Sequence, residues 1–149
     1  MYDIREVTAT EMLENAESLF AEHWDEIALN KKVMVLKPDA ERYLAMEASG
    51  GLFILAAYSD DELVGYSVNF TMQHLHYSDL CVASNDLLFV SRGHRKSRVG
   101  LQLIKATEKL AKDRGASLVL WHAKPDTALV ELMPRLGYGV QDIIFSREL

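Results

Sequence analysis

Five basic side chains fall within seven residues of a chain that is otherwise acidic: Arg92, His94, Arg95, Lys96 and Arg98. A short apolar run, residues 87–90, precedes this cluster, and from residue 99 apolar side chains recur at helical spacing. The first N–H groups of a helix have no partners within it, and the helix dipole adds positive charge there. This order predicts a strand, a basic loop and a helix that together bind a pyrophosphate or nucleotide. The alternative is a solvated basic turn before an ordinary surface helix.

Two histidines form a second candidate site. His74 and His76 end an apolar stretch that begins at residue 63, and within a strand they would share one face. Such a pair can bind a metal, but no obvious third ligand lies nearby in the sequence. The single Cys81 also excludes a cysteine-based zinc site. We therefore predict no metal site, and a histidine pair that faces either substrate or solvent.

The end of an amphipathic helix near the N-terminus is a third candidate. Apolar residues from Met12 to Trp24 lie on one helical stripe, which closes with His23 and Trp24 beside Glu26. One interpretation is that this end of the helix simply faces the core. The other is that it overhangs a substrate cleft, where His23 or Glu26 touches the substrate.

The remaining patterns place these candidates in an α/β fold. Short apolar runs bounded by turn residues predict strands, and residues at helical spacing predict helices. In chain order we expect a strand at 2–7, a helix at 8–24 and a helix after 38 that ends at 50–51. A hairpin of 52–58 and 63–77 follows, and then a connection at 78–83. The remaining elements are a strand at 87–90, a helix at 99–114, a strand at 117–122, a short helix after 125 and a strand at 140–146. The strand–helix–strand crossover implies parallel neighbouring strands in a sheet covered by helices.

Length and charge limit the class of protein. At 149 residues the chain is expected to form one domain, residues 1–149. A formal net charge of −6 argues against nucleic acid as a partner, although it permits a local phosphate site. No apolar run approaches the roughly 18 residues of a membrane span, and the N-terminus lacks a basic-then-apolar signal. We therefore expect no membrane partner and a cytoplasmic location.

The segment Arg95-Lys-Ser-Arg-Val-Gly100 resembles the acetyl-CoA-binding signature of the GNAT N-acetyltransferases. That signature has Gln or Arg first, Gly fourth, and Gly or Ala sixth. Arg98 stands where the signature has its middle glycine, which lets the backbone approach the pyrophosphate closely. Arg98 must therefore hold an ordinary helical conformation or contact phosphate itself.

Other parts of the chain are also similar to this family. Leu136-Gly137-Tyr138 resembles the triplet that closes the family's last helix, with Asp126 at the usual Asn position and Met133 at the usual Tyr position. That tyrosine often protonates the leaving thiolate, so this role is unassigned here, with Tyr138, Tyr77 and solvent as the candidates. The expected order of elements resembles the GNAT fold over nearly the whole chain. The segments 23–26 and 74–77 look like features of small members encoded in phage and prophage genomes.

The resemblance implies a mixed central sheet with helices on both faces. It also implies an N-acetyltransferase that uses acetyl-CoA as co-substrate, without a metal, and transfers acetyl to a primary amine by direct attack in a ternary complex. The acceptor could be a small amine, an amino acid, an antibiotic or a protein amino group, and homodimers are common in the family. The implied cofactor-binding residues are Leu88, Phe89, Val90, Arg95, Lys96, Ser97, Arg98, Val99, Gly100 and Asp126.

Family members often place a catalytic carboxylate on the strand before the basic loop, and Asp86 is the candidate here. Asp86 is two and four residues before Leu88 and Val90, so in a regular strand the three side chains would share one face. Burial would raise the pKa of Asp86 and make it a better proton acceptor. Alternatively, it lies at an exposed strand start and bonds nearby backbone. The backbone N–H near Leu88 is the candidate donor to the oxyanion. The candidate acceptor-binding residues are His23, Glu26, His74 and His76.

Two other functions remain open at this point. A catalytically silent CoA-binding or interaction protein could retain the fold, and Arg98 and Met133 favour that interpretation. An acetyltransferase toxin that modifies aminoacyl-tRNA would need a broad basic face, which the net negative charge opposes.

Overall fold

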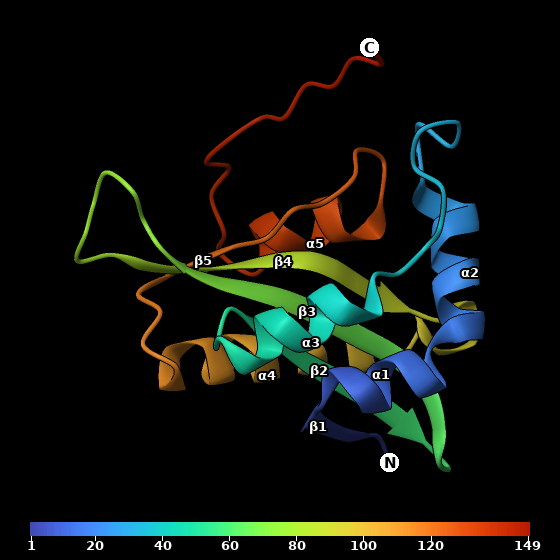
Figure 1. Ribbon diagram of the computed structural model, residues 1–149. Coiled ribbons are helices and arrows are strands. Elements are labelled where there is room, and N and C mark those ends of the chain that lie inside the picture. Colours follow the sequence, from blue (N-terminus) through green and yellow to red (C-terminus); the bar gives the residue numbers. More distant parts are fainter.

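The computed structural model describes residues 1–149, and its strands form one five-stranded sheet in chain order (Figure 1). The strands are β1 (Asp3–Val7), β2 (Leu52–Ser59), β3 (Glu62–Gln73), β4 (Cys81–Val90) and β5 (Leu118–Leu120). The strands from β1 to β4 pair antiparallel with their sequence neighbours, whereas β4 and β5 run parallel. The predicted hairpin and the predicted strand–helix–strand crossover are thereby confirmed.

Helices cover both faces of this sheet. The helices are α1 (Ala9–Asn15), α2 (Glu17–Ile27), α3 (Ala40–Ala48), α4 (Val99–Asp113) and α5 (Ala128–Arg135), with a single 3₁₀ turn at Arg92–His94. One buried cluster joins α1 and α2 to the sheet through Met12, Phe20 and Tyr66. A second cluster joins α4 to the opposite face through Val99 and Leu103. The mixed sheet with helices on both faces is as expected.

Local signals explain where several elements begin and end. The Thr8 hydroxyl accepts the Glu11 N–H at 3.1 Å and so caps α1, at the residue where the sequence predicted a helix to start. The predicted helix at 8–24 is, however, two helices that meet at Ala16. The turn between β2 and β3 holds Asp60 and Asp61 at φ of 50° and 66°, a left-handed conformation that aspartate tolerates. This turn fixes the pairing of the two central strands.

Three strand predictions need correction. Residues 140–146, predicted as a strand, have no regular structure because they pair with no neighbour, and a strand exists only through such pairing. β3 ends at Gln73, so residues 74–77 belong to a turn and not to the strand. β4 begins at Cys81, within the segment that we expected to be a connection. In each case the apolar pattern was compatible with a strand, and only the partner strand decided its extent.

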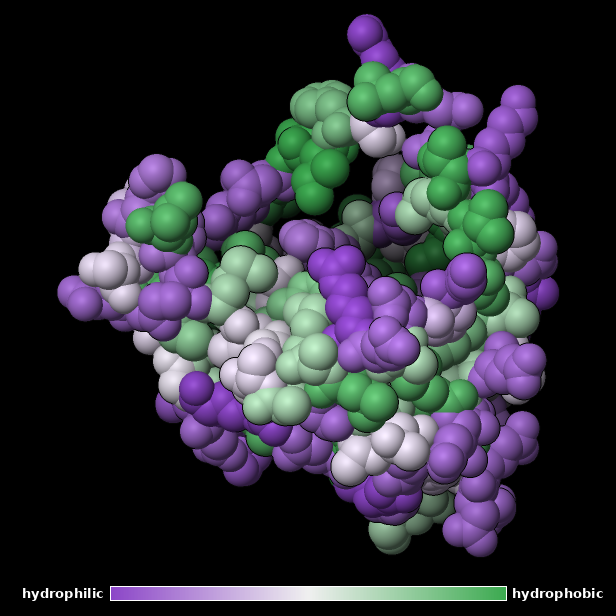
Figure 2. Space-filling model, viewed as in Figure 1, coloured by the Kyte–Doolittle hydropathy of each residue, from purple (hydrophilic) through white to green (hydrophobic).

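The C-terminal segment leaves several apolar side chains in solvent. Val140, Ile143, Ile144 and Phe145 are all exposed. The space-filling view shows apolar residues gathered along this segment at the top of the molecule (Figure 2). No helix of the chain combines the length and the apolar character needed to cross a membrane.

Candidate active site

β4 and β5 separate soon after they meet. Their parallel pairing covers only Val82–Ser84 on β4 and Leu118–Leu120 on β5. One residue further along β4, the side chain of Asn85 makes the hydrogen bonds to the next segment that the backbone would make in a continued ladder. Its Nδ2 donates to the His122 carbonyl at 3.2 Å, and its Oδ1 accepts the His122 N–H at 2.5 Å. Beyond this contact the edge of β4 that faces β5 has no strand partner.

The backbone of Leu88 points into this opening. The Ser91 N–H donates to the Val64 carbonyl at 2.9 Å, and bonding positions alternate along an antiparallel pair. Phe89 therefore bonds to β3, whereas the N–H groups of Leu88 and Val90 point away from β3. The Phe89 side chain is buried in the core. The N–H of Leu88 thus has the exposure that a donor to a bound carbonyl requires.

A β-bulge places Asp86 on the opposite face from Leu88. Leu87 pairs with Val68 and Asn85 pairs with Asn69, so Asp86 has no opposing residue. Leu88 and Val90 pack toward the α4 side of the sheet, but Asp86 lines a cavity beneath α3. The equal parity of these residues in the sequence predicted a common face, and that prediction was wrong because a bulge interrupts the alternation of side chains.

The cavity beneath α3 has a volume of about 340 Å³. It is lined by Asp39, Arg42, Tyr43, Met46, Leu52, Val68, Phe70 and Asp86. Burial raises the pKa of the Asp86 carboxyl, although the residue as a whole is exposed, and His122 and Arg42 oppose this shift. Burial, with a smaller contribution from Asp86, raises the pKa of Tyr43 to about 12. The cavity therefore joins an apolar floor to one carboxylate with a strengthened affinity for protons.

The basic loop presents backbone donors at the start of α4. The N–H groups of Arg98, Gly100 and Leu101 have no hydrogen-bond partner within the protein, whereas the Val99 N–H donates to the Ser97 hydroxyl at 3.2 Å. Arg98 has φ of −86° and ψ of 1°, in the bridge region that non-glycine residues adopt at turns, so its conformation needs no glycine. An added Cβ at Gly100 would meet only Val90 Cγ2, at 3.8 Å. The loop thus has the free donors and positive charge that fit a pyrophosphate.

Arg95 and Glu26 form a bidentate ion pair between the basic loop and α2. The Arg95 guanidinium donates to the two Glu26 carboxylate oxygens at 2.7 and 2.8 Å, and its Nε donates to the Val90 carbonyl at 2.9 Å. Arg92 contacts the same carboxylate at 3.2 Å. The hydrogen bond from Arg95, more than that from Arg92, holds the pKa of Glu26 below its usual range. Both Glu26 and the Arg95 side chain are thus engaged in fixing the loop to α2.

His23 belongs to the core. Only 5% of its surface is exposed, its ring stacks on Phe89 at 4.4 Å, and its Nδ1 lies 2.6 Å from the Tyr66 hydroxyl oxygen. Burial lowers the pKa of His23 to about 4, so the ring is neutral near pH 7. His23 therefore faces the core, as the first interpretation of this helix end expects, and its burial leaves little surface for the contact with an acceptor that the second expects.

His74 and His76 lie at the other end of the sheet from the basic loop. They follow β3 in the turn before Cys81, where β4 starts, whereas the basic loop follows Val90, where β4 ends (Figure 1). Asp86 pairs near Val68, so a strand rise of about 3.3 Å per residue puts the histidines roughly 20 Å away. This distance from Asp86 favours the solvent-facing interpretation of the histidine pair over the substrate-facing one.

Three residues in or beside the last helix, α5, were singled out by the family resemblance: Asp126, Met133 and Tyr138. Asp126 has φ of 60° and lies in the loop before α5, outside the helix. Met133, at the position where the family often has tyrosine, is buried. The Tyr138 hydroxyl bonds the Glu108 carboxylate, which also accepts the Trp121 indole N–H. Burial and then this bond raise the pKa of Tyr138. Tyr138 is therefore held at the junction with α4.

Sequence reasoning missed four residues near Asp86. Asn85 and His122 define the point where β4 and β5 separate, and Arg42 and Tyr43 line the cavity from α3. A polar residue within an apolar strand was a visible signal for Asn85. No local signal identifies His122, Arg42 or Tyr43, because their proximity to Asp86 depends on how α3 and β5 pack against β4.

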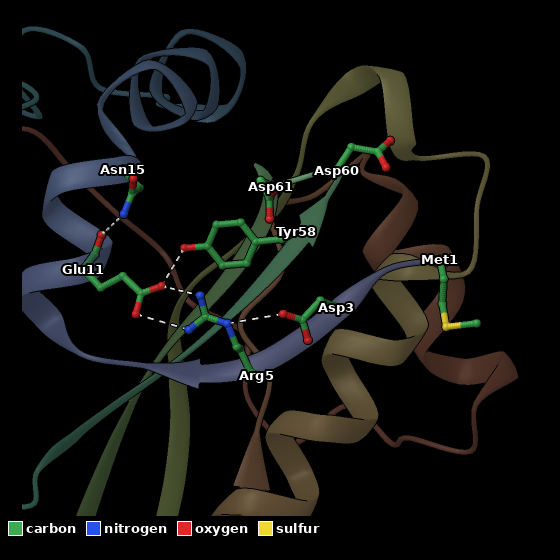
Figure 3. Close-up of a pocket in the computed structure, with 8 residues that line it drawn as sticks. All are labelled: Met1, Asp3, Arg5, Glu11, Asn15, Tyr58, Asp60 and Asp61. Atoms are coloured by element: carbon green, nitrogen blue, oxygen red, sulfur yellow. Dashed lines mark hydrogen bonds and ion pairs between the residues drawn. The ribbon is translucent and has the colours of Figure 1, made fainter.

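A second hollow, of about 380 Å³, is polar and lies at the β1 edge of the sheet (Figure 3). Arg5 donates to both Glu11 oxygens at 3.2 and 2.6 Å, and the Tyr58 hydroxyl donates to Glu11 at 3.0 Å. Asn15 also donates to the Glu11 carbonyl at 2.7 Å. These groups satisfy one another, and two strands separate them from β4, so we assign this hollow a structural role. No group of three or more potential metal ligands is present in the structure.

Comparisons with known proteins agree with this architecture. An aminoglycoside acetyltransferase from an uncultured soil metagenomic sample has a TM-score of 0.80 and 18% identity, with 100% of this chain and 99% of that chain covered. A ribosomal-protein-alanine N-acetyltransferase from Brucella melitensis biovar Abortus has a TM-score of 0.76, 16% identity and the same coverage. A second soil aminoglycoside acetyltransferase, solved with sisomicin, has a TM-score of 0.73 and 17% identity, with 99% and 96% covered.

These structural similarities show the fold, and the sequence comparison shows the family. Curated protein sequences give no match. The profile of the Acetyltransferase (GNAT) family, in contrast, matches residues 9–138, which include every strand except β1 and the whole of the basic loop. The chain therefore belongs to the GNAT acetyltransferase family.

Proposed function

We propose that this protein transfers acetyl from acetyl-CoA to a primary amine by direct attack in a ternary complex. One observation carries the proposal: at Asp86–Leu88, β4 combines a carboxylate that faces a cavity with an N–H group that faces an open strand edge. The two reactants would thus meet at the open edge beside one short segment of β4. Such positioning supplies a large part of the acceleration of a two-substrate reaction.

The free backbone donors of the chain fit acetyl-CoA, the co-substrate typical of this family. The unpaired N–H groups at Arg98, Gly100 and Leu101, with the charges of Lys96 and Arg98, would hold the pyrophosphate. The outward N–H and carbonyl of Leu88 and the outward N–H of Val90 would pair with the amides of the pantetheine arm, because Arg95 already occupies the Val90 carbonyl. The co-substrate supplies the acetyl group as an activated thioester.

Asp86 is our candidate for the base. A primary ammonium must lose a proton before it can attack, because its pKa in water is near 10.4. The raised pKa of Asp86 makes this carboxylate a stronger proton acceptor than an aspartate in water. The Leu88 N–H would donate to the carbonyl oxygen as negative charge develops there. Since Met133 is buried and Tyr138 is bonded to Glu108, we assign protonation of the leaving thiolate to water.

Calorimetric titration with acetyl-CoA, followed by thiol-release assays over a panel of amines, tests this proposal. We expect binding at micromolar level and release that depends on an amine. Asp86→Asn should keep the binding and lose the release, whereas Asp79→Asn, the same change in the exposed turn before β4, should keep both. Binding without release on any amine, peptide amino groups included, would favour a silent CoA-binding protein. Absence of binding would refute the cofactor site.

A further inference from the structure

The cavity beneath α3 also limits which amine can be accepted. Building on the proposed function, we propose that the acceptor is a small monoamine with a flat apolar body, of the aralkylamine class. The alternative is a polyhydroxylated aminosugar, such as the substrates named for two structural neighbours. The proposal depends on the lining, charge and size of this cavity.

The floor of the cavity is apolar and leads away from Asp86. Val68 and Leu52 form this floor and are buried, with exposed fractions of 1% and 2%. Phe70 lies two residues beyond Val68 on the same face of β3, about 7 Å along the strand. Leu52 pairs with Phe70 across the sheet. An ammonium at Asp86 with a two-carbon spacer would therefore place an aromatic ring over Leu52 and Phe70.

The walls of the cavity come from α3. Tyr43 and Met46 are half-buried and pack against the same apolar cluster as the floor. A thioether and an aromatic ring make favourable contacts with a second ring. A sugar placed over Met46 and the apolar floor would bury its hydroxyl groups without hydrogen bonds, which is unfavourable. The lining thus favours a hydrocarbon body over a polyhydroxylated one.

The charge and the volume of the cavity limit the class of amine acceptor further. The cavity has two carboxylates, Asp39 and Asp86, and one guanidinium, Arg42, which leaves one net negative charge for one ammonium. One Asp39 oxygen already accepts the Arg42 backbone N–H at 3.0 Å as the cap of α3. A volume of about 340 Å³ is near the lower limit of small-molecule sites. It matches one ring with a short amine arm, whereas most of a multi-ring aminoglycoside would lie outside the cavity.

Binding measured separately from turnover tests this inference. The probes are 2-phenylethylamine, glucosamine and the aminoglycoside kanamycin, each titrated into the full chain with acetyl-CoA or CoA present. We expect 2-phenylethylamine to bind at least about tenfold more tightly than glucosamine, since burial of a ring of this size is worth a factor of that order. The ratio of kcat/KM values for these amines should follow the same order.

Two Phe→Asn variants, one in the cavity and one outside it, distinguish a loss of amine binding from an effect on the whole protein. Phe70→Asn should weaken 2-phenylethylamine binding about tenfold, and Phe70→Leu should restore most of it. Phe145→Asn, the same change in the exposed C-terminal segment, should change nothing. Acetyl-CoA affinity and the midpoint of thermal unfolding report on the fold of each variant.

Each outcome distinguishes this inference from the proposed function. Equal or tighter binding of glucosamine or kanamycin would overturn the aralkylamine class and leave the transferase activity intact. An unchanged affinity in a folded Phe70→Asn protein would also overturn it. Selective binding of 2-phenylethylamine without thiol release would refute the transferase activity while supporting the amine site.

Discussion

The side-chain amide of Asn85 bonds both backbone groups of His122 at the position where β4 and β5 separate. It takes the place of one further residue pair in the parallel ladder. Asn85 is 3% exposed, so its amide is fixed in one orientation by these bonds. The segment after β5 is thereby held to β4 while the backbone edge from Asp86 to Val90 stays open. This contact marks the point from which the proposed cofactor cleft opens.

Asn85→Ala should therefore weaken acetyl-CoA binding without removing any group that contacts it. Loss of the two bonds should also lower the free energy of unfolding by about 1–2 kcal/mol, because the exposed His122 backbone can bond water instead. Asn85→Asp keeps the acceptor for the His122 N–H and should be intermediate at neutral pH. Urea unfolding and acetyl-CoA calorimetry measure the two effects. Acetyl-CoA affinity that stays equal to wild type in a destabilised Asn85→Ala protein would contradict this role.

The raised pKa of Asp86 predicts a particular pH dependence. The base acts only when ionised, so kcat/KM should fall as the pH drops through a value above the usual aspartate pKa of 3.8. Asp86→Asn should remove this limb and lower kcat by about 10²–10⁴-fold. Since the folded protein holds the proton more tightly than the unfolded chain, Asp86→Asn should also increase stability near pH 7. A profile with an unchanged acid limb in this variant would show that another group is the base.

His23 should make the protein less stable in mild acid. Its pKa is about 4 in the folded protein, against 6.5 for the ordinary group. Between these values the unfolded chain binds a proton that the folded protein does not, so stability falls as the pH drops from about 6.5 to about 4. A difference of this size corresponds to about 3 kcal/mol at most. His23→Gln should flatten this part of the curve of unfolding free energy against pH, and an equally steep curve would contradict the assignment.

Arg98 tests whether arginine can replace the glycine of the signature. Because its φ is negative, Arg98→Ala should leave the fold unchanged. If its guanidinium contacts phosphate, this variant should weaken acetyl-CoA binding several-fold and reduce the dependence of the affinity on salt. Lys109→Ala, which removes a basic residue from the exposed side of α4, provides the control. Tighter acetyl-CoA binding by Arg98→Gly would instead mean that the arginine side chain obstructs the site.

Local sequence patterns determined where several helices and turns of the fold lie. The cap at Thr8, the aspartate turn between β2 and β3, and the helix that follows the basic loop each depend on residues close together in the chain. Hydrogen bonds and apolar periodicity over one or two turns were sufficient to predict them. The similarity of the basic loop to a known signature then identified the family.

Tertiary structure decided which candidate side chains meet. His23 closes the predicted helix stripe and Glu26 lies beside it, but packing buries the first against Phe89, and Arg95 forms an ion pair with the second. His74 and His76 follow an apolar strand pattern, yet β3 stops before them because its pairing with β4 ends at Gln73 and Cys81. Asp86 lies on the opposite face of the sheet from the one predicted, because the pairing of β4 with β3 contains a β-bulge at this residue. Face, burial and strand extent are properties of a pair of segments, so one segment's sequence could not fix them.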